Sequence, residues 1–176
     1  VKGSEAHSSL APEAVNAVEF AAELISHIKL IARRIKRVGP FDPLFDIPHT
    51  TIHTGTIRGG TALNIVPKEC DFEFEIRHLP EESSDVYMNE IRDFINQKLE
   101  PEMKSLSAEA GFEFSIKSSM PGLHTDPGDS VVSFAKSLTG MNDHAKVSFG
   151  TEAGPFQQTA GIPTVVCGPG SIVQAH

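Results

Sequence analysis

The sequence predicts an α+β protein whose first part is a split βαββαβ domain of the ferredoxin type, with a single sheet and two helices. Two long helical stripes of apolar residues, each followed by a run with strand-like alternation, support this prediction. After Ser119 the pattern changes to short strands that alternate with helices, which indicates part of an α/β domain. We therefore expect residues 1–118 and residues 119–176 to form separate domains, with the first strand, near residue 1, truncated.

The first helix is predicted from apolar residues at alternating spacings of four and three. Pro12 suits the first helical turn, where its missing N–H costs nothing, and Gly39-Pro40 ends the helix. The stripe consists of Ala14, Val18, Ala21, Ile25, Ile28, Ala32 and Ile35. Such a stripe is expected to face a core.

The next elements are predicted to be strands and a second helix. Residues 50–57 are rich in β-branched side chains, and residues 70–77 alternate apolar with charged side chains, so one face of the second strand is buried. Residues 81–103 form the second amphipathic helix. Beyond Gly111, alternation at Phe112, Phe114 and Ile116 predicts the strand that completes the sheet.

The second part begins with turn material. Asp126 is expected to cap a helix from Pro127 to about Thr139. A short strand at 147–149, a helix at 152–159 and a buried strand at 162–167 follow, and a glycine-rich loop then leads to His176. A polar side chain after such a strand and loop is a common way for an α/β sheet to present chemistry.

Composition limits the possible partners and surroundings. The chain has 176 residues and a net charge of −8, which argues against nucleic acid or an anionic membrane. No stretch approaches the ~18 apolar residues of a membrane span. Cys70 and Cys167 lie in apolar runs, so we expect buried free thiols and a cytoplasmic protein, with a disulfide between the two cysteines as the open alternative. The chain does not begin with Met, so we expect it to be incomplete at that end.

Several polar residues are candidates for chemistry, each with an ordinary alternative. His7 precedes a helix in a turn and could be a surface histidine; Asn64 could be a turn former. Arg77 could form a cross-strand ion pair, and Glu152 could be a first-turn helix acid. His176 alone is no metal site, since Zn²⁺ takes at least three protein ligands. No Gly-x-Ser-x-Gly elbow and no phosphate-binding glycine pattern occurs.

Five stretches together resemble the two-metal amidohydrolase/peptidase family. They are Gly3-x-x-Ala-His7-Ser-Ser-x-x-Pro12, Gly59-Gly60-x-Ala-x-Asn64, Ile76-Arg77-x-Leu-Pro80, Thr151-Glu152-Ala153 and Gly168-Pro-Gly-Ser-Ile172-x-Gln-Ala-His176. The last stretch is the most specific, and the resemblance covers essentially the whole chain.

The resemblance implies a lid and dimerisation domain at 1–118 and a partial catalytic domain at 119–176. It implies two metal ions, Zn²⁺ or Co²⁺, with His176 as one ligand and the other ligands absent from this chain. It implies a homodimer in which His7 acts on the partner's site by stabilising an oxyanion. The substrate-binding residues that it implies are Asn64, Arg77, Thr151, Glu152, Gly168 and Gly170.

The reaction implied is hydrolysis of an N-acyl amino acid, with N-acetylornithine the expected substrate and arginine biosynthesis the expected pathway. Alternatives within the family are another deacylase, a desuccinylase or a dipeptidase. Taken alone, these residues would be inactive and would act at most as a dimerisation module.

Overall fold

Helix α1 (Ala17–Val38) is the longest element of the computed structural model, which describes residues 1–168. The Asn16 side-chain oxygen accepts hydrogen bonds from the N–H groups of Val18 and Glu19, at 3.1 and 3.2 Å, and so caps the helix. Gly39, with φ of 79°, ends it. The predicted helix is confirmed but starts later, because residues 8–13 form a short 3₁₀ helix, η1 (Ser8–Glu13). The buried residues of α1 are Ala17, Ala21, Leu24, Ile28, Ile31 and Ile35.

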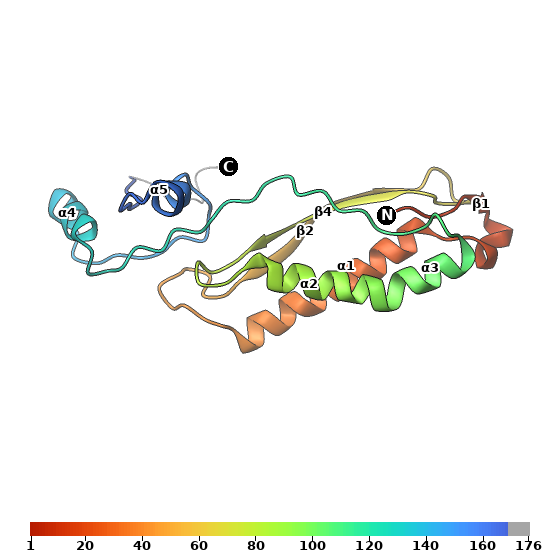
Figure 1. Ribbon diagram of the computed structural model, residues 1–176, viewed down its shortest axis with the longest axis horizontal. Coiled ribbons are helices and arrows are strands. Elements are labelled where there is room, and N and C mark those ends of the chain that lie inside the picture. Colours follow the sequence, from red (N-terminus) through yellow and green to blue (C-terminus); the bar gives the residue numbers. More distant parts are fainter. Residues whose placement is uncertain (169–176) are drawn as a thin grey trace. The chain divides into compact units, whose positions relative to one another are not determined.

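Strands β2 (Thr51–Gly59) and β4 (Cys70–Arg77) form an antiparallel pair that covers the helices. Thr51 lies opposite Arg77 at one end and Gly59 opposite Cys70 at the other. The register shifts between Thr54 and Thr56, which marks a bulge. Helices α1 and α2 (Ser84–Phe94) lie on one face of this pair (Figure 1). The α+β class is therefore confirmed.

Helix α2 continues through a π-helical segment, η2 (Ile95–Leu99), into α3 (Glu100–Leu106). The Ser83 hydroxyl accepts a hydrogen bond from the Asp85 N–H and caps α2. The buried residues along these elements recur at every fourth position: Tyr87, Ile91, Ile95, Leu99 and Met103. In a regular α-helix, positions four apart drift by about 40° at each step. The wider π turn offsets this drift and keeps the series on one face.

A buried polar cluster ties the start of β2 to α2. Thr50 is fully buried, and its hydroxyl donates to the Glu82 carboxylate, which also accepts a hydrogen bond from the Tyr87 hydroxyl. Burial, together with the hydrogen bond to Glu82, raises the pKa of Tyr87 to about 12. Nearby, Arg34 and Glu90 form a two-pronged ion pair between α1 and α2.

The prediction of a single sheet is wrong for the described residues. They form two separate two-stranded sheets, β2 with β4 and the very short β1 (Ala6–His7) with β3 (Ile65–Val66). Residues 112–117 are irregular, and the expected strand near residue 1 is reduced to isolated bridges at Lys2. Alternation alone does not make a strand, because a strand also needs a neighbour to complete its hydrogen bonds.

The second part forms two helices and no strand within the described residues. Helix α4 (Ser130–Thr139) is capped by Asp129, not by Asp126, and α5 (Ala153–Ala160) follows. The strands expected at 147–149 and 162–167 do not form. Cys167 is exposed, contrary to expectation, whereas Cys70 is buried as predicted. Burial raises the pKa of the Cys70 thiol.

The chain divides into two units. Unit 1 consists of Val1–Phe41, His49–His78 and Glu82–Lys117. Unit 2 consists of residues 42–48, residues 79–81 and the chain from Ser118 onward. The assignment of a lid and a catalytic domain to residues 1–118 and 119–176 stays a prediction. None of the helices within residues 1–168 combines the length and apolar character needed to cross a membrane.

Candidate functional site

His7 and Asn64 lie beside each other at one end of unit 1. In the β1–β3 pair, His7 lies opposite Ile65, and the Ser8 N–H donates to the Asn64 carbonyl oxygen at 3.0 Å. Both side chains belong to exposed residues. The structure therefore brings together two of the residues predicted for substrate binding and catalysis.

The local hydrogen bonds of His7 fix which ring nitrogen carries the proton. Its Nδ1 accepts a hydrogen bond from the Ser9 N–H at 3.2 Å, and the Ser9 hydroxyl lies 2.8 Å from the same atom. Because Nδ1 is an acceptor, the neutral ring carries its proton on Nε2. A neutral His7 can therefore donate a hydrogen bond from Nε2 to an oxygen in front of it.

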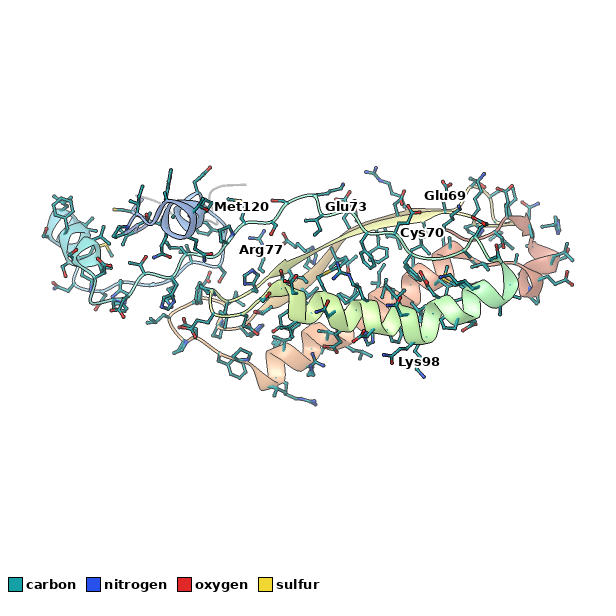
Figure 2. All side chains as sticks on the ribbon, viewed as in Figure 1. Glu69, Cys70, Glu73, Arg77, Lys98 and Met120 are labelled. Carbon is teal, nitrogen blue, oxygen red and sulfur yellow. The ribbon has the colours of Figure 1, made fainter. Side chains whose placement is uncertain are left out.

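Arg77 lies at the other end of the same unit. It is the last residue of β4, whose eight residues span about 24 Å, at roughly 3.4 Å per residue in an antiparallel strand. Its Nε and Nη2 donate to the two Glu75 carboxylate oxygens, at 2.9 and 3.2 Å. This is an ion pair along the strand, whereas the alternative predicted from the sequence was a pair across strands. Figure 2 shows Arg77 at the far end of β4 from Cys70.

The remaining predicted residues belong to unit 2 or lie outside the described part. The Thr151 hydroxyl accepts a hydrogen bond from the Ala153 N–H at 3.2 Å, at the start of α5. Glu152 occupies the N-cap position of α5, but its exposed side chain makes no capping hydrogen bond. Gly168 is exposed. Gly170 and His176 lie outside the described residues.

Close packing next to α5 requires a glycine. A Cβ atom on Gly154 would lie 2.0 Å from the Pro121 carbonyl oxygen, so only glycine fits. The Gln158 side-chain amide also donates to the Gly122 carbonyl at 2.8 Å. These contacts hold the first turn of α5, with Thr151 and Glu152, against residues 121–122.

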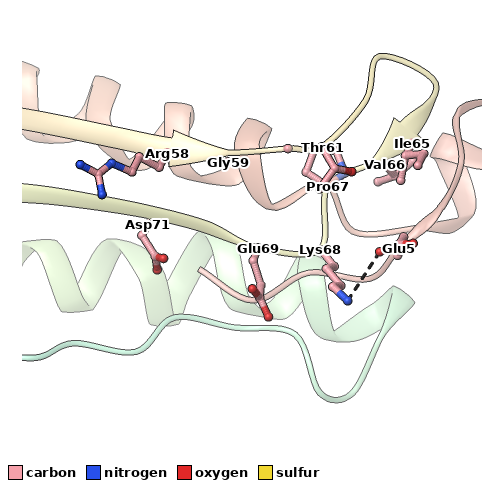
Figure 3. Close-up of a pocket in the computed structure, with 11 residues that line it drawn as sticks. Glu5, Arg58, Gly59, Thr61, Ile65, Val66, Pro67, Lys68, Glu69 and Asp71 are labelled. Carbon is pink, nitrogen blue, oxygen red and sulfur yellow. Dashed lines mark ion pairs between the residues drawn. The ribbon is translucent and has the colours of Figure 1, made fainter.

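A pocket at the β2–β3 connection lies close to Asn64, and Gly59 and Gly60 of the motif that ends at Asn64 belong to its lining. The pocket itself was not predicted from the sequence. Its charged lining residues are Glu5, Arg58, Lys68, Glu69 and Asp71, and Glu5 pairs with Lys68 at 3.7 Å (Figure 3). Acidic and basic groups are mixed there, so the lining does not favour one sign of ligand charge. Across residues 1–168, no three His, Cys, Asp or Glu side chains are grouped in a way that could hold a metal ion.

Comparison with known proteins matches the first part of the chain to a family model. Residues 1–103 match the model of the peptidase dimerisation domain, M20_dimer. Over all 176 residues the chain is 34% identical to an acetylornithine deacetylase from Pectobacterium carotovorum subsp. carotovorum (strain PC1) and 32% identical to one from Shigella sonnei (strain Ss046). The chain spans 44% of the length of each of these relatives.

Two solved structures are similar in fold. A tripeptidase from Staphylococcus aureus subsp. aureus Mu50 is 24% identical, with a TM-score of 0.60, and the likeness covers 92% of this chain and 39% of the tripeptidase. Aminopeptidase PepT from Bacillus cereus ATCC 10987 is 25% identical, also with a TM-score of 0.60, over 87% of this chain and 37% of that protein.

Proposed function

Since this chain belongs to the M20 peptidase dimerisation-domain family, we propose that it supplies the lid and part of the catalytic domain of a hydrolase that cleaves N-acyl amino acids. N-acetylornithine is the proposed substrate, with ornithine and acetate as products. The likeness to two acetylornithine deacetylases over the whole chain supports this choice. Arginine biosynthesis in the cytoplasm is the proposed setting.

The separation of His7 from Arg77 supports a composite active site. His7 and Asn64 lie together near the Cys70 end of the β2–β4 pair, whereas Arg77 lies at the opposite end of β4, a strand about 24 Å long. An amino acid derivative is too small to contact His7 and Arg77 of the same chain. We therefore propose a homodimer in which one site takes His7 and Asn64 from one protomer and Arg77 from the other.

The free edge of β2 offers a way to build this dimer. Within the described residues β2 pairs only with β4, so its other edge carries unpaired N–H and C=O groups. Ile57 on this strand is 51% exposed. A second copy of the strand, running antiparallel, would complete these hydrogen bonds and satisfy the twofold symmetry of a homodimer.

The described side chains have distinct proposed roles. The Nε2–H of His7 donates to the oxyanion that forms when the amide carbonyl is attacked. The Arg77 guanidinium leaves Glu75 and binds the substrate carboxylate through two parallel hydrogen bonds. The Asn64 amide adds one hydrogen bond, and Gly168 and Gly170 are proposed to bind the substrate through their backbone groups.

The proposed cofactor is a pair of Zn²⁺ or Co²⁺ ions with His176 as one ligand. Such ions supply an activated water molecule near neutral pH. The described residues do not form a site for them, so no further role is assigned through the metals.

Glu152 is proposed to select the substrate side chain. Ornithine carries a side-chain ammonium group, and Glu152 has an exposed carboxylate without a capping hydrogen bond. If it pairs with the ammonium, Glu152→Gln should hydrolyse N-acetylornithine and an uncharged acetylated analogue at similar rates, whereas the wild type prefers ornithine. Unchanged selectivity in the variant would refute this role.

A direct test is hydrolysis by the whole metal-loaded protein of N-acetylornithine, N-succinyl-diaminopimelate and a tripeptide. Preference for N-acetylornithine supports the proposal. Preference for the succinyl compound would indicate a desuccinylase, and preference for the tripeptide a peptidase, which the fold likeness to PepT favours as the second candidate. If the protein hydrolyses none of these substrates, the alternative that these residues act only as a dimerisation module is favoured.

His7→Ala in the whole protein tests the catalytic role. We expect kcat to fall by roughly 10²–10³, the usual effect of losing one oxyanion donor, with unchanged metal content. Loss of bound metal in this variant would show that the assigned role is wrong.

A further inference from the structure

We propose that the pocket at the β2–β3 connection binds a free α-amino acid in its zwitterionic form. No role proposed above for His7, Asn64 or Arg77 depends on this site. All of its lining residues belong to unit 1, and its cavity volume is about 270 Å³. Sites for drug-sized ligands have volumes of roughly 300–1,000 Å³. The pocket therefore suits a ligand of about the size of a single amino acid.

The pocket lies on the face of the β2–β4 pair that points away from the helices. Cys70 and Phe72 on β4 pack into the core clusters beneath the pair. Because side chains alternate between the two faces of a strand, Glu69 and Asp71 line the pocket from the outer face. Arg58 lies opposite Asp71 in the register and shares this face. Figure 3 shows Arg58 and Asp71 on the two neighbouring strands.

Backbone hydrogen bonds hold one wall of the pocket, residues 66–69, in place. The Gly3 N–H donates to the Lys68 carbonyl oxygen at 2.7 Å, and the Ala17 N–H donates to the Pro67 carbonyl oxygen at 2.9 Å. The wall is thus tied to segments that are distant in the sequence. A site that is already formed loses little free energy to ordering when a ligand binds.

The pocket presents charged groups of both signs that are not paired with each other. Residues of opposite charge that lie directly opposite on neighbouring strands commonly attract each other. Within residues 1–168, however, Arg58 and Asp71 form no ion pair and no side-chain hydrogen bond, and the same holds for Glu69. The other lining cation, Lys68, already pairs with Glu5 at 3.7 Å. One unpaired guanidinium and two unpaired carboxylates therefore remain for a ligand.

This set of groups matches an α-amino acid better than a simple ion. The amino acid's carboxylate can accept two parallel hydrogen bonds from the Arg58 guanidinium, and its ammonium group can donate to Asp71 and Glu69. A simple anion would meet more carboxylates than cations. In the described part of the chain, the carboxylates are not grouped in a way that could hold a metal ion. Ile65 and Pro67 add apolar lining for the ligand's side chain.

Isothermal titration calorimetry of the whole protein with three ligands that share one aliphatic chain tests this site. L-norleucine carries both charged groups, hexanoate lacks the ammonium group, and pentylamine lacks the carboxylate. We expect norleucine to bind more tightly than either of the others by roughly tenfold or more, because each lost contact is a hydrogen bond to a charged group. The heat of binding is measured without hydrolysis, so the result does not depend on the proposed reaction.

Two pocket variants separate the two proposed contacts. Arg58→Gln should weaken norleucine binding by roughly tenfold or more and leave pentylamine binding unchanged. Asp71→Asn should weaken norleucine binding and leave hexanoate binding unchanged. Arg33→Gln and Asp93→Asn remove the same charges from exposed positions on α1 and α2 and should change neither affinity. Circular dichroism of each variant checks that it is folded.

Three results would overturn the proposal. In the first, norleucine binds no more tightly than hexanoate or pentylamine. In the second, the pocket variants and the matched controls weaken norleucine binding equally. In the third, Arg77→Gln abolishes norleucine binding and Arg58→Gln does not, which would show that norleucine occupies the proposed substrate site instead. Failure to hydrolyse N-acetylornithine would overturn the proposed function alone.

Discussion

Unit 1 and unit 2 differ in how their apolar side chains are covered. In unit 1, two helices and the β2–β4 pair enclose a core whose members include Leu24, Ile28 and Ile91, each at most 1% exposed. In unit 2, Phe134 is 62% exposed and Leu138 is 71% exposed. Local signals such as helix caps act in both units, but within residues 1–168 the clusters of buried apolar side chains all belong to unit 1. A helix can form from its own sequence, whereas a core needs a second layer.

Truncating one leucine in each unit should show the difference in stability between the two units most clearly. Leu24→Ala in unit 1 should lower the free energy of unfolding by about 2–5 kcal/mol, because a fully buried side chain leaves a cavity. Leu138→Ala in unit 2 should change it by less than about 0.5 kcal/mol. Urea unfolding measures both. Equal losses would show that α4 is covered as well as α1.

Alkaline pH should destabilise unit 1 through Tyr87. Its pKa is about 12 in the folded state and about 10 when unfolded, so above pH 10 the unfolded chain releases the proton first. The contribution of Tyr87 to stability should therefore be complete below pH 10 and fall by roughly 2 kcal/mol as pH rises towards 12. Tyr87→Phe should flatten this part of the pH profile. A slope that persists in the variant would assign the effect to another group.

Removing one donor from the free edge of β2 should weaken the proposed homodimer without unfolding unit 1. Cys70 bonds to Val1 on the side of β4 away from β2, so the next residue along β4 faces Arg58, and the backbone groups of Ile57 face away from β4. Proline is tolerated at such edge positions. Ile57→Pro should raise the dimer dissociation constant at least tenfold in sedimentation. Ile57→Thr, which keeps the donor, is the control. If both variants weaken the dimer equally, the contact is made by the Ile57 side chain and not by its backbone N–H.

Acidic pH should slightly destabilise unit 2 through protonation of Asp42. Lys146 donates to its carboxylate at 2.6 Å and lowers the pKa of Asp42. The stabilisation is therefore present above the ordinary carboxyl pKa of about 4 and is lost as pH falls through the lower folded value. We expect an effect below about 1 kcal/mol, as for other partly exposed pairs. Asp42→Asn should abolish it, and this is checked by exchange of the Lys146 amide, which bonds to the Leu44 carbonyl.

The sequence predicted the helices better than the sheets. Asn16, Gly39 and the apolar stripe define α1 through interactions between near neighbours. Phe112, Phe114 and Ile116 show equally regular alternation, but a strand requires backbone partners from elsewhere in the chain. The strand expected at 162–167 does not form, because it too lacks a backbone partner within the described residues. Cys167 is therefore exposed.

For the candidate site, the sequence identified residues but not their grouping. Nothing in the motifs showed that His7 and Asn64 lie together while Arg77 lies at the far end of β4. That separation depends on strand direction and register. The proton position on His7 likewise depends on a hydrogen bond from the Ser9 backbone, which spacing alone does not reveal.

The π-helical segment between α2 and α3 makes the number of residues there matter more than their identity. Ile91, Ile95, Leu99 and Met103 stay on one face only because the wide turn offsets the drift. Deleting one exposed residue there, such as Lys98, would change one spacing from four to three, and spacings of four, three and four keep these side chains on one face of a regular α-helix. Inserting one more residue would instead turn Met103 by about 100° and move it out of the core. Substitutions at Lys98 and a single deletion beside it should therefore be tolerated in descendants of this gene, whereas insertions should be purged.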